Sequence, residues 1–149
     1  MREVVRATGH EHVSAEHTST FEVTSDEWLT PAGDCILAVA ADRVPADFDD
    51  AFVAACRDRD ATIQATLVAT TDDDETITQT ITGRGDPDLS FENERSHVGR
   101  TSEYVDDRTV LVGADGAAAD VDREMVDALA AGADLRLELV VEPDGRDPS

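Results

Sequence analysis

The sequence predicts a single-domain α+β protein in which internally duplicated strand–helix–strand units form a mostly antiparallel sheet system with two main helices. Three observations support this prediction: segments that alternate apolar and polar residues, two segments with apolar residues at helical spacing, and a repeated order of these elements. The 149 residues suffice for one compact core. We expect one domain over 1–149, with repeats at about 2–74 and 75–142 and a disordered polar tail at about 143–149.

The first half of the chain is expected to contain strands, a helix and a hairpin. Polar and apolar residues alternate over 13–24, which is typical of a half-buried strand. The almost wholly apolar segment 35–41 predicts a fully buried strand. A helix is expected over 46–57, where apolar residues recur at helical spacing. Strands over 62–69 and 76–82 are expected to flank an acidic hairpin turn.

The second half repeats this order of elements. We expect a buried strand over 109–112, a helix over 117–131 and an alternating strand over 135–141. Asp42 and Asp115 hold the same place in the two halves, 73 positions apart, and the same offset relates further positions of the two helices. This constant offset indicates a tandem duplication, whose two copies would pack around a pseudo-twofold axis.

The composition is strongly acidic. The chain has 34 acidic residues, a formal net charge of −22, and 12 basic residues that are all arginine. Molar salt shortens the electrostatic screening length to about 3 Å, so an acidic chain of this kind is tolerated in concentrated salt. The composition resembles that of proteins from extremely halophilic archaea. Exposed acidic residues are therefore not taken as catalytic on their charge alone.

Cysteine usage and the N-terminus predict a cytoplasmic protein. Cys35 and Cys56 lie in apolar surroundings without metal-ligand spacing, so they are interpreted as small buried hydrophobic residues, and a disulfide between them is not favoured. The first residues carry charges and do not resemble a signal peptide. No apolar run approaches the roughly 20 residues that span a bilayer, so no membrane partner is expected.

Histidines are the first candidates for chemistry. His10 and His12 point the same way on an extended segment, but a metal site needs three or four converging ligands. Two exposed loop histidines are the favoured interpretation, a metal site is the alternative, and no metal or cofactor is predicted. His17 falls on the apolar face of the segment 13–24. A buried histidine near a carboxylate would be an acid–base candidate.

Two aspartates and an arginine are further candidates. Asp42 and Asp115 each follow a buried strand and precede a helix, so each carboxylate either faces a ligand or caps its own helix, which is the commoner role. A twofold relation between the halves would place a site between them. Arg100 could bind an anion as a fork donor or pair with neighbouring acidic residues, and Asp34 and Ser102 complete the proposed ligand set.

Well-known catalytic and nucleotide-binding motifs are absent. The sequence has no GxGxxG fingerprint, Walker-type loop, GxSxG elbow or HExxH helix. A basic stripe, which usually accompanies nucleic-acid binding, is also missing from the linear sequence.

Two long patterns, one in each half, carry a resemblance to a known family. They comprise GHEHV from 9, HTSTFE from 17, GDCI from 33 and AD at 41 in the first half, and GRGDP from 83, RTS from 100, RT at 108 and AD at 114 in the second. The chain thereby resembles, over about 2–141, an archaeal family described as domain of unknown function 371. This family brings no established activity. A lysine often follows each Ala-Asp pair in the family, whereas Arg43 and Gly116 stand there in this chain, which disfavours identical anion binding by both halves.

The resulting functional hypothesis is a cleft between the two repeats that binds a small polar or anionic ligand. His17, Asp42 and Asp115 are the candidate catalytic residues, and Asp34, Arg100 and Ser102 are the candidate ligand-binding residues; whether a reaction takes place stays open. The alternative is a non-enzymatic module that binds RNA or a protein partner. Nucleic acid is not indicated by the sequence, and the oligomeric state stays open.

Overall fold

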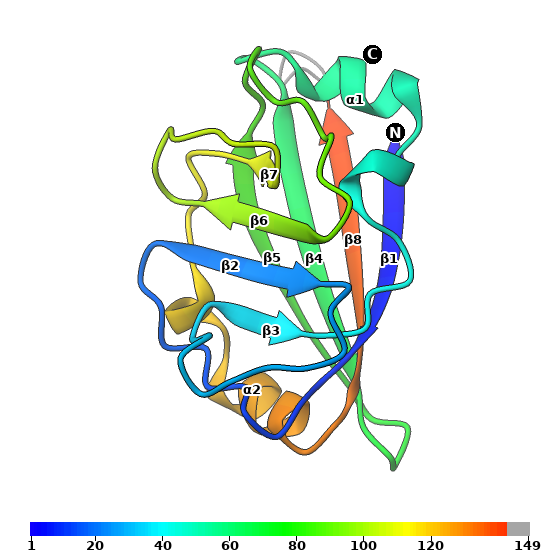
Figure 1. Ribbon diagram of the computed structural model, residues 1–149, viewed down its shortest axis with the longest axis vertical. Helices are drawn as coiled ribbons and strands as arrows, with labels where there is room; N and C mark the ends of the chain where they lie inside the picture. Colours follow the sequence, from blue (N-terminus) through cyan, green and yellow to red (C-terminus); the bar gives the residue numbers. More distant parts are fainter. Residues whose placement is uncertain (143–149) are drawn as a thin grey trace.

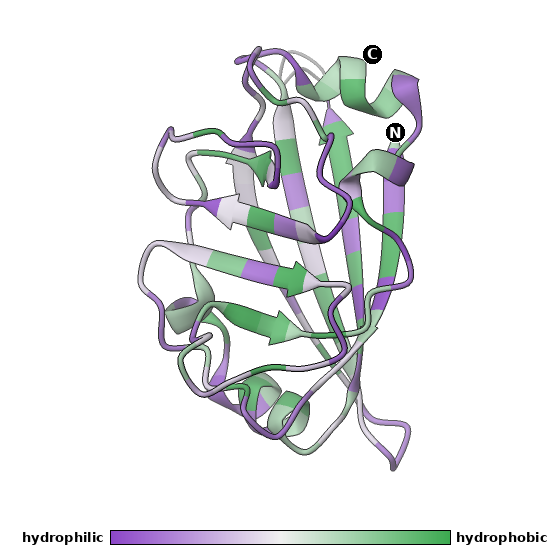
Figure 2. Cartoon of the chain, in the orientation of Figure 1, coloured by the Kyte–Doolittle hydropathy of each residue, from purple (hydrophilic) through white to green (hydrophobic). Residues whose placement is uncertain are grey.

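A computed structural model of the chain describes residues 1–142, so the predicted tail at 143–149 lies outside the described residues. Sheet A has the strand order β1-β8-β4-β5 and is antiparallel throughout. Its strands are β1 (Arg2–Thr8), β8 (Asp134–Glu142), β4 (Thr62–Thr70) and β5 (Thr76–Arg84). Hydropathy alternates along β4 and β8 (Figure 2), because one face of this sheet packs on the core and the other faces solvent.

Sheet B has the order β3-β2-β6-β7. The central strands β2 (Thr20–Thr24) and β6 (Ser96–Arg100) are antiparallel. The short outer strands β3 (Ile36–Ala38) and β7 (Thr109–Leu111) each run parallel to their neighbour. The prediction of an α+β protein with a mostly antiparallel sheet system is therefore confirmed.

The two sheets face each other and are joined at both edges. The strands of sheet B cross those of sheet A at a steep angle (Figure 1), which is the orthogonal type of sheet packing. Thr8 exchanges two backbone hydrogen bonds with Val39, of 2.8 and 2.7 Å. Arg84 exchanges two with Val112, of 2.8 and 3.0 Å. These bridges connect β1 to the segment after β3 and β5 to the segment after β7.

Each predicted helix is shorter than expected and is divided in two. A 3₁₀ turn, η1 (Pro45–Asp47), precedes α1 (Asp50–Cys56), and η2 (Ala118–Asp120) precedes α2 (Arg123–Ala130). The predictions of continuous helices over 46–57 and 117–131 are wrong, because two residues with extended ψ interrupt each segment. The ψ angles are 148° at Phe48 and 136° at Asp49 in the first segment, and 134° at Val121 and 129° at Asp122 in the second. The two helices close opposite ends of the molecule (Figure 1).

The core lies between the sheets and beneath the helices. It draws side chains from the inner faces of both sheets and from both helices, and the largest fully buried ones are Phe21, Phe52, Leu37, Ile63, Leu67, Ile81, Leu89, Leu111, Met125, Leu129, Leu135 and Leu137. All four phenylalanines are buried, whereas the single tryptophan and the single tyrosine are exposed. In the described residues no helix is long and apolar enough to cross a membrane.

Sequence reasoning misassigned part of the N-terminal region. The strand predicted over 13–24 forms only at 20–24, and the first part of the alternating segment is a loop. Ala15 has φ 49°, a left-handed conformation that cannot continue a strand, so the prediction for 13–19 is wrong. β1 is missing from the predicted elements, because the charged Glu3 lies on its inner face and the apolar Val4 on its outer face, which masks the alternation.

The two halves show the same order of elements along the chain, from β1 to β4 and from β5 to β8. The likeness extends to unusual backbone positions. Ala15 and Phe91 have φ 49° and 52°, and Ala40 and Gly113 have φ 56° and 57°. Each pair holds the corresponding place in its half. This matched order favours the tandem duplication, which stays a prediction.

Candidate functional site

Asp42 and Asp115 occupy corresponding positions, but the structure places them at opposite edges of sheet A. The Asp42 carboxylate accepts a 2.9 Å hydrogen bond from the backbone N–H of Arg6 in β1. The Asp115 carboxylate accepts a 2.9 Å bond from the backbone N–H of Thr82 in β5. Strands β8 and β4 separate these two edges, so the two aspartates do not share a site. Each carboxylate instead satisfies an outward N–H of an edge strand.

His17 and Asp34 lie together in the loops that flank β2. The Nδ1 atom of His17 accepts backbone N–H bonds of 3.2 Å from Ser19 and Thr20, and the Asp34 carbonyl accepts from His17 at 3.3 Å. Asn93 makes the matching contacts in the second half, accepting from Arg95 at 2.8 Å. The matching amide shows that this position orders a loop, and a role of His17 in catalysis stays a prediction.

Arg100 is held by a network around Asp106. Its guanidinium donates to the Asp106 carboxylate at 2.8 Å and to the Thr109 hydroxyl at 2.9 Å, and its side chain is 12% exposed. Arg108 also contacts Asp106, at 3.0 Å. Burial alone would raise the pKa of Asp106, but hydrogen bonds from Arg108 and Thr109 and the nearby Arg100 charge lower it to about 2. The network fixes the loop 101–108 and takes up hydrogen-bond donors of the Arg100 guanidinium. Within residues 1–142, Ser102 accepts hydrogen bonds from the backbone N–H groups of Gly113 and Tyr104.

We expect Asp106→Asn to destabilise the fold by about 2 kcal/mol, because charge-assisted hydrogen bonds to two arginines are lost. The lowered pKa means that Asp106 stabilises the wild type above about pH 4 and that this contribution disappears as the pH falls through about 2. Urea unfolding at neutral pH measures the first effect. Asp107→Asn is the matched control, and an equal loss in both variants would contradict this role.

His10 and His12 make hydrogen bonds to backbone groups of the loops before and after β2. The Nδ1 atom of His10 accepts from the backbone N–H of His12 at 3.0 Å, and the Nδ1 atom of His12 lies 2.8 Å from the carbonyl oxygen of Leu29. Within residues 1–142 no three or more histidine, cysteine or acidic side chains are grouped for a metal ion.

His97 is a buried titratable group that sequence reasoning did not single out for chemistry. The residue is 1% exposed, and its ring stacks on that of Phe48 with 5.3 Å between centroids. The Nε2 atom lies 2.8 Å from the Arg43 carbonyl, which can only accept, so Nε2 carries the proton. Burial lowers the pKa of His97 to about 4, although the bond to the Arg43 carbonyl opposes this shift. A neutral, enclosed ring cannot exchange protons with a ligand in solution.

Neither cysteine is suited to act as a nucleophile. Burial and the adjacent Glu22 raise the pKa of Cys35 to about 11, and burial raises that of Cys56 to about 12. Both thiols are therefore protonated at neutral pH, and the thiolate is the reactive form.

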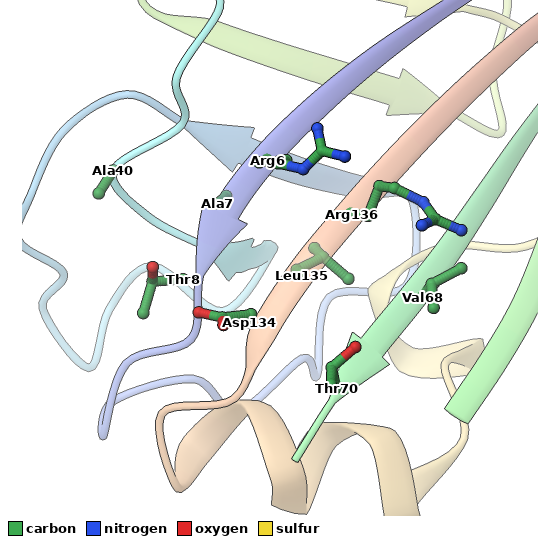
Figure 3. A pocket seen from close by; sticks show the side chains of 9 residues that line it. All are labelled: Arg6, Ala7, Thr8, Ala40, Val68, Thr70, Asp134, Leu135 and Arg136. Atoms are coloured by element: carbon green, nitrogen blue, oxygen red, sulfur yellow. The ribbon is translucent and has the colours of Figure 1, made fainter. Parts of the chain in front are cut away.

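A pocket of about 420 Å³ lies on the outer face of sheet A, where β1, β8 and β4 meet the segment after β3. Its volume is within the range of small-molecule sites. Apolar side chains form part of the wall, and charged or hydroxyl side chains form the rest (Figure 3). The lining residues are Arg6, Ala7, Thr8, Ala40, Val68, Thr70, Asp134, Leu135 and Arg136.

Two arginines stand side by side in this pocket. Arg6 of β1 pairs directly with Arg136 of β8, so both side chains leave the same face of the sheet (Figure 3). Within residues 1–142 Arg6 makes no ion pair, and Arg136 makes only a 3.9 Å contact with Glu138. Asp134 lies in the same pocket, beside Thr8. The arrangement offers two fork-shaped cationic donors, one carboxylate acceptor and two hydroxyl groups.

The corresponding place in the other half lacks this chemistry. There Thr82 pairs directly with Gln64, in the positions that correspond to Arg6 and Arg136. The fold therefore does not require the arginine pair. Like charges directly opposite each other on neighbouring strands destabilise a sheet. A pair that the fold does not need, and that carries an electrostatic cost, is a candidate for binding.

None of the six residues proposed from the sequence lines this pocket. Asp42 contacts one of the lining residues, since its carboxylate accepts a hydrogen bond from the backbone N–H of Arg6. The signal that could have found the site is weak: Arg6 and Arg136 both occupy outward positions of alternating strands, but only strand register shows that they meet.

Comparison with known proteins agrees with the resemblance seen in the sequence. The model of the family described as domain of unknown function 371 matches residues 5–142. An uncharacterized protein of Methanocaldococcus jannaschii is 34% identical over 141 residues, which cover 95% of this chain and all of the relative. The matched range includes every strand and helix from β2 to β8 and most of β1. The chain therefore belongs to the family described as domain of unknown function 371.

Proposed function

We propose that this protein binds a small oxyanion-bearing molecule in the pocket lined by Arg6 and Arg136. The observation that carries the proposal is the arginine pair of a chain whose net charge is −22, because a single 3.9 Å contact between Arg136 and Glu138 is the one ion pair that these two arginines make within residues 1–142. Acidic residues are abundant enough to neutralise both arginines, yet Arg6 has no ion-pair partner in the described part of the chain. An anionic group of a ligand would relieve the repulsion between the two guanidinium groups.

The rest of the pocket defines the class of ligand. Two guanidinium groups favour a phosphate or carboxylate group, which each can bind through two parallel hydrogen bonds. Asp134 would repel a second anionic group and would accept from a hydroxyl or amino group. The ligand is therefore a small metabolite with one oxyanion at one end and a hydrogen-bond donor at the other. The pocket takes residues from both halves of the chain.

The test replaces the two arginines by the residues that hold the corresponding positions in the other half of the protein. The double variant Arg6→Thr with Arg136→Gln reproduces the pair Thr82 and Gln64. We expect its fold to be as stable as the wild type, whereas affinity for oxyanion ligands falls about thirtyfold or more, because two charged donors are lost. Titration calorimetry with inorganic phosphate and a panel of phosphorylated and carboxylated metabolites, at constant ionic strength, measures the affinity.

The matched control removes two positive charges elsewhere. Arg57→Gln with Arg95→Gln changes the net charge equally at two exposed sites that do not line the pocket. If this control loses as much affinity as the pocket variant, the effect is a general one of net charge and the site is wrong. Failure of every ligand in the panel to bind the wild type also contradicts the proposal.

A second candidate function is a non-enzymatic module for a protein partner. Trp28 and Tyr104 are 64% and 62% exposed and hold corresponding places in the loops after β2 and β6. Exposed aromatic side chains of this kind are frequent anchors of protein interfaces. Acidic neighbours at Asp26, Glu27 and Glu103 disfavour nucleic acid. A partner complex that is lost in Trp28→Ala with Tyr104→Ala, but kept in the pocket variant, would favour this function.

A further inference from the structure

One edge of sheet A is unprotected. The outer edge of β5 is occupied only at its C-terminal end, where Thr82 bonds Asp115 and Arg84 bonds Val112. Thr76, Thr78 and Thr80 share the orientation of Thr82, because peptide groups alternate in direction along a strand. Their outward N–H and C=O groups have no hydrogen-bond partner within residues 1–142. This leaves a five-residue segment of exposed edge.

The exposed edge also lacks the features that usually prevent strand pairing. Residues 76–83 have the sequence TITQTITG, without charge or proline, in a chain with 46 charged residues among 149. The ladder between β5 and β4 continues from Thr62–Arg84 to Thr70–Thr76 without a bulge. Edge strands of monomeric proteins are usually short, charged, bulged or covered, because an open edge recruits another strand.

The opposite edge shows the usual protection. β1 carries Arg2 and Arg6, and three groups from the segment after β3 occupy its outer side. Val39 pairs with Thr8, the Asp42 carboxylate bonds the Arg6 backbone, and the Arg43 guanidinium donates to the Val4 carbonyl at 3.1 Å. The outer strands of sheet B have only three residues each. β5 is thus the long edge that is left open.

We propose that two copies of this chain associate through antiparallel pairing of their β5 edges, which joins two A sheets into one continuous sheet. A twofold axis at Thr78 pairs this residue with its own copy and pairs Thr76 with Thr80 of the second copy. Each of these pairs exchanges two backbone hydrogen bonds. Threonine side chains then face each other across the seam, as Thr66 and Thr80 already do within sheet A with 3.1 Å between their hydroxyl oxygens.

The β5 edge is uncharged and can pair with an identical strand in antiparallel orientation, which favours a second copy as its occupant. Two chains of net charge −22 repel at most orientations, and the uncharged β5 edge is where they can approach. The acidic turn 72–75 and Asp115 flank the open segment, and the antiparallel pairing brings the turn of one copy toward Asp115 of the other. Salt screens this repulsion, so association strengthens as ionic strength rises.

The experiment is sedimentation velocity over a range of protein concentrations, from low to molar KCl. We expect a monomer–dimer equilibrium whose dissociation constant falls as KCl rises. Thr78→Pro removes one outward N–H that the fold itself does not use, and we expect the dissociation constant to rise about tenfold or more. Arg2→Pro is the matched control, because Arg2 holds the corresponding position in β1. It should leave the dissociation constant unchanged.

A second variant keeps the test decisive if proline disturbs β5. Thr78→Asp preserves the backbone and places two carboxylates face to face at the twofold axis, so it should also give monomers. A wild type that stays monomeric at every concentration and salt level overturns the proposal. A dimer that survives both Thr78 variants overturns it as well. Phosphate binding at the Arg6 and Arg136 pocket is expected to be unchanged in these variants, so the two proposals fail independently.

Discussion

Replacing Gly85 with alanine is expected to destabilise the protein by about 3 kcal/mol or more. Gly85 follows β5 and passes directly against the end of α1, where a Cβ atom would overlap the carbonyl oxygens of Cys56 and Asp58. These are backbone atoms at the end of a helix, and they cannot move aside as a flexible side chain would. The adjacent Asp86 N–H also bonds the Cys56 carbonyl at 3.1 Å, so separation of the two segments breaks a hydrogen bond.

The other half of the chain allows a second, independent test of this prediction. Gly9 follows β1 and passes the end of α2, where a Cβ atom would overlap the backbone of Leu129. Gly9→Ala should therefore be as destabilising as Gly85→Ala. Urea unfolding followed by far-ultraviolet circular dichroism measures both, because the exposed Trp28 is a weak reporter of the core.

Gly116→Ala is the matched control for both glycine variants. A Cβ atom at Gly116 meets its nearest neighbour, the Cβ of Asp120, at 3.4 Å, which is an ordinary contact. We expect a change within about 1 kcal/mol in either direction. Gly85→Ala with the stability of the wild type would show that the close approach to α1 is not a constraint.

Local patterns predicted the central part of this fold well. The strands β4 and β8 alternate strictly over nine residues each, and β5 alternates over its first six, so all three strands could be predicted from their periodicity. The positions of the two helices along the chain were predicted correctly, but each was wrongly predicted to be continuous. At the interruption, the ring of Phe48 packs against those of Phe52 and Phe91, whose centroids lie 5.6 and 5.8 Å away. We attribute the extended conformation of Phe48 to this packing.

The candidate pocket could not be predicted because it depends on strand order. Arg6 and Arg136 are far apart in the sequence and meet only because β8 inserts between β1 and β4. Strand order also explains why the expectation that Asp42 and Asp115 are neighbours is wrong. Residues at corresponding positions of the two halves would be neighbours only where the halves meet, whereas these two bond the outer strands β1 and β5.

Differences between the halves are therefore more informative about function than their similarities. Matching positions such as Gly9 and Gly85 serve the fold, since each half needs them equally. The pair Arg6 and Arg136 stands where the other half has Thr82 and Gln64. His97 also differs between the halves, because the corresponding residue of β2 is the buried Phe21, but this difference affects stability and not a binding site.

His97 is expected to make the stability of the protein strongly dependent on pH between about 6.5 and 4. In the unfolded chain a histidine has a pKa of about 6.5, whereas burial lowers the pKa of His97 in the fold to about 4. The unfolded state then binds more protons across this interval, so the free energy of unfolding falls as the pH falls. A difference of about 2.5 pKa units corresponds to about 3 kcal/mol.

The structural reason is that a protonated His97 would be enclosed without a second acceptor. Nε2 already donates to the Arg43 carbonyl, and Nδ1 is buried without a partner in the described residues, so an added proton on Nδ1 would have nothing to bond. The Arg43 charge opposes protonation further, while Asp47 and Asp42 favour it. Phe48 covers one face of the ring and keeps water away.

Comparison of His97→Leu with the wild type isolates this contribution from that of the many carboxylates that titrate below pH 5. We expect the variant to lose about 3 kcal/mol less than the wild type between pH 6.5 and 4, in urea unfolding at constant ionic strength. His12→Gln, at an exposed loop position, should retain the wild-type dependence. Parallel curves for His97→Leu and the wild type would mean that His97 binds its proton equally well in the folded and unfolded states, and would contradict the prediction.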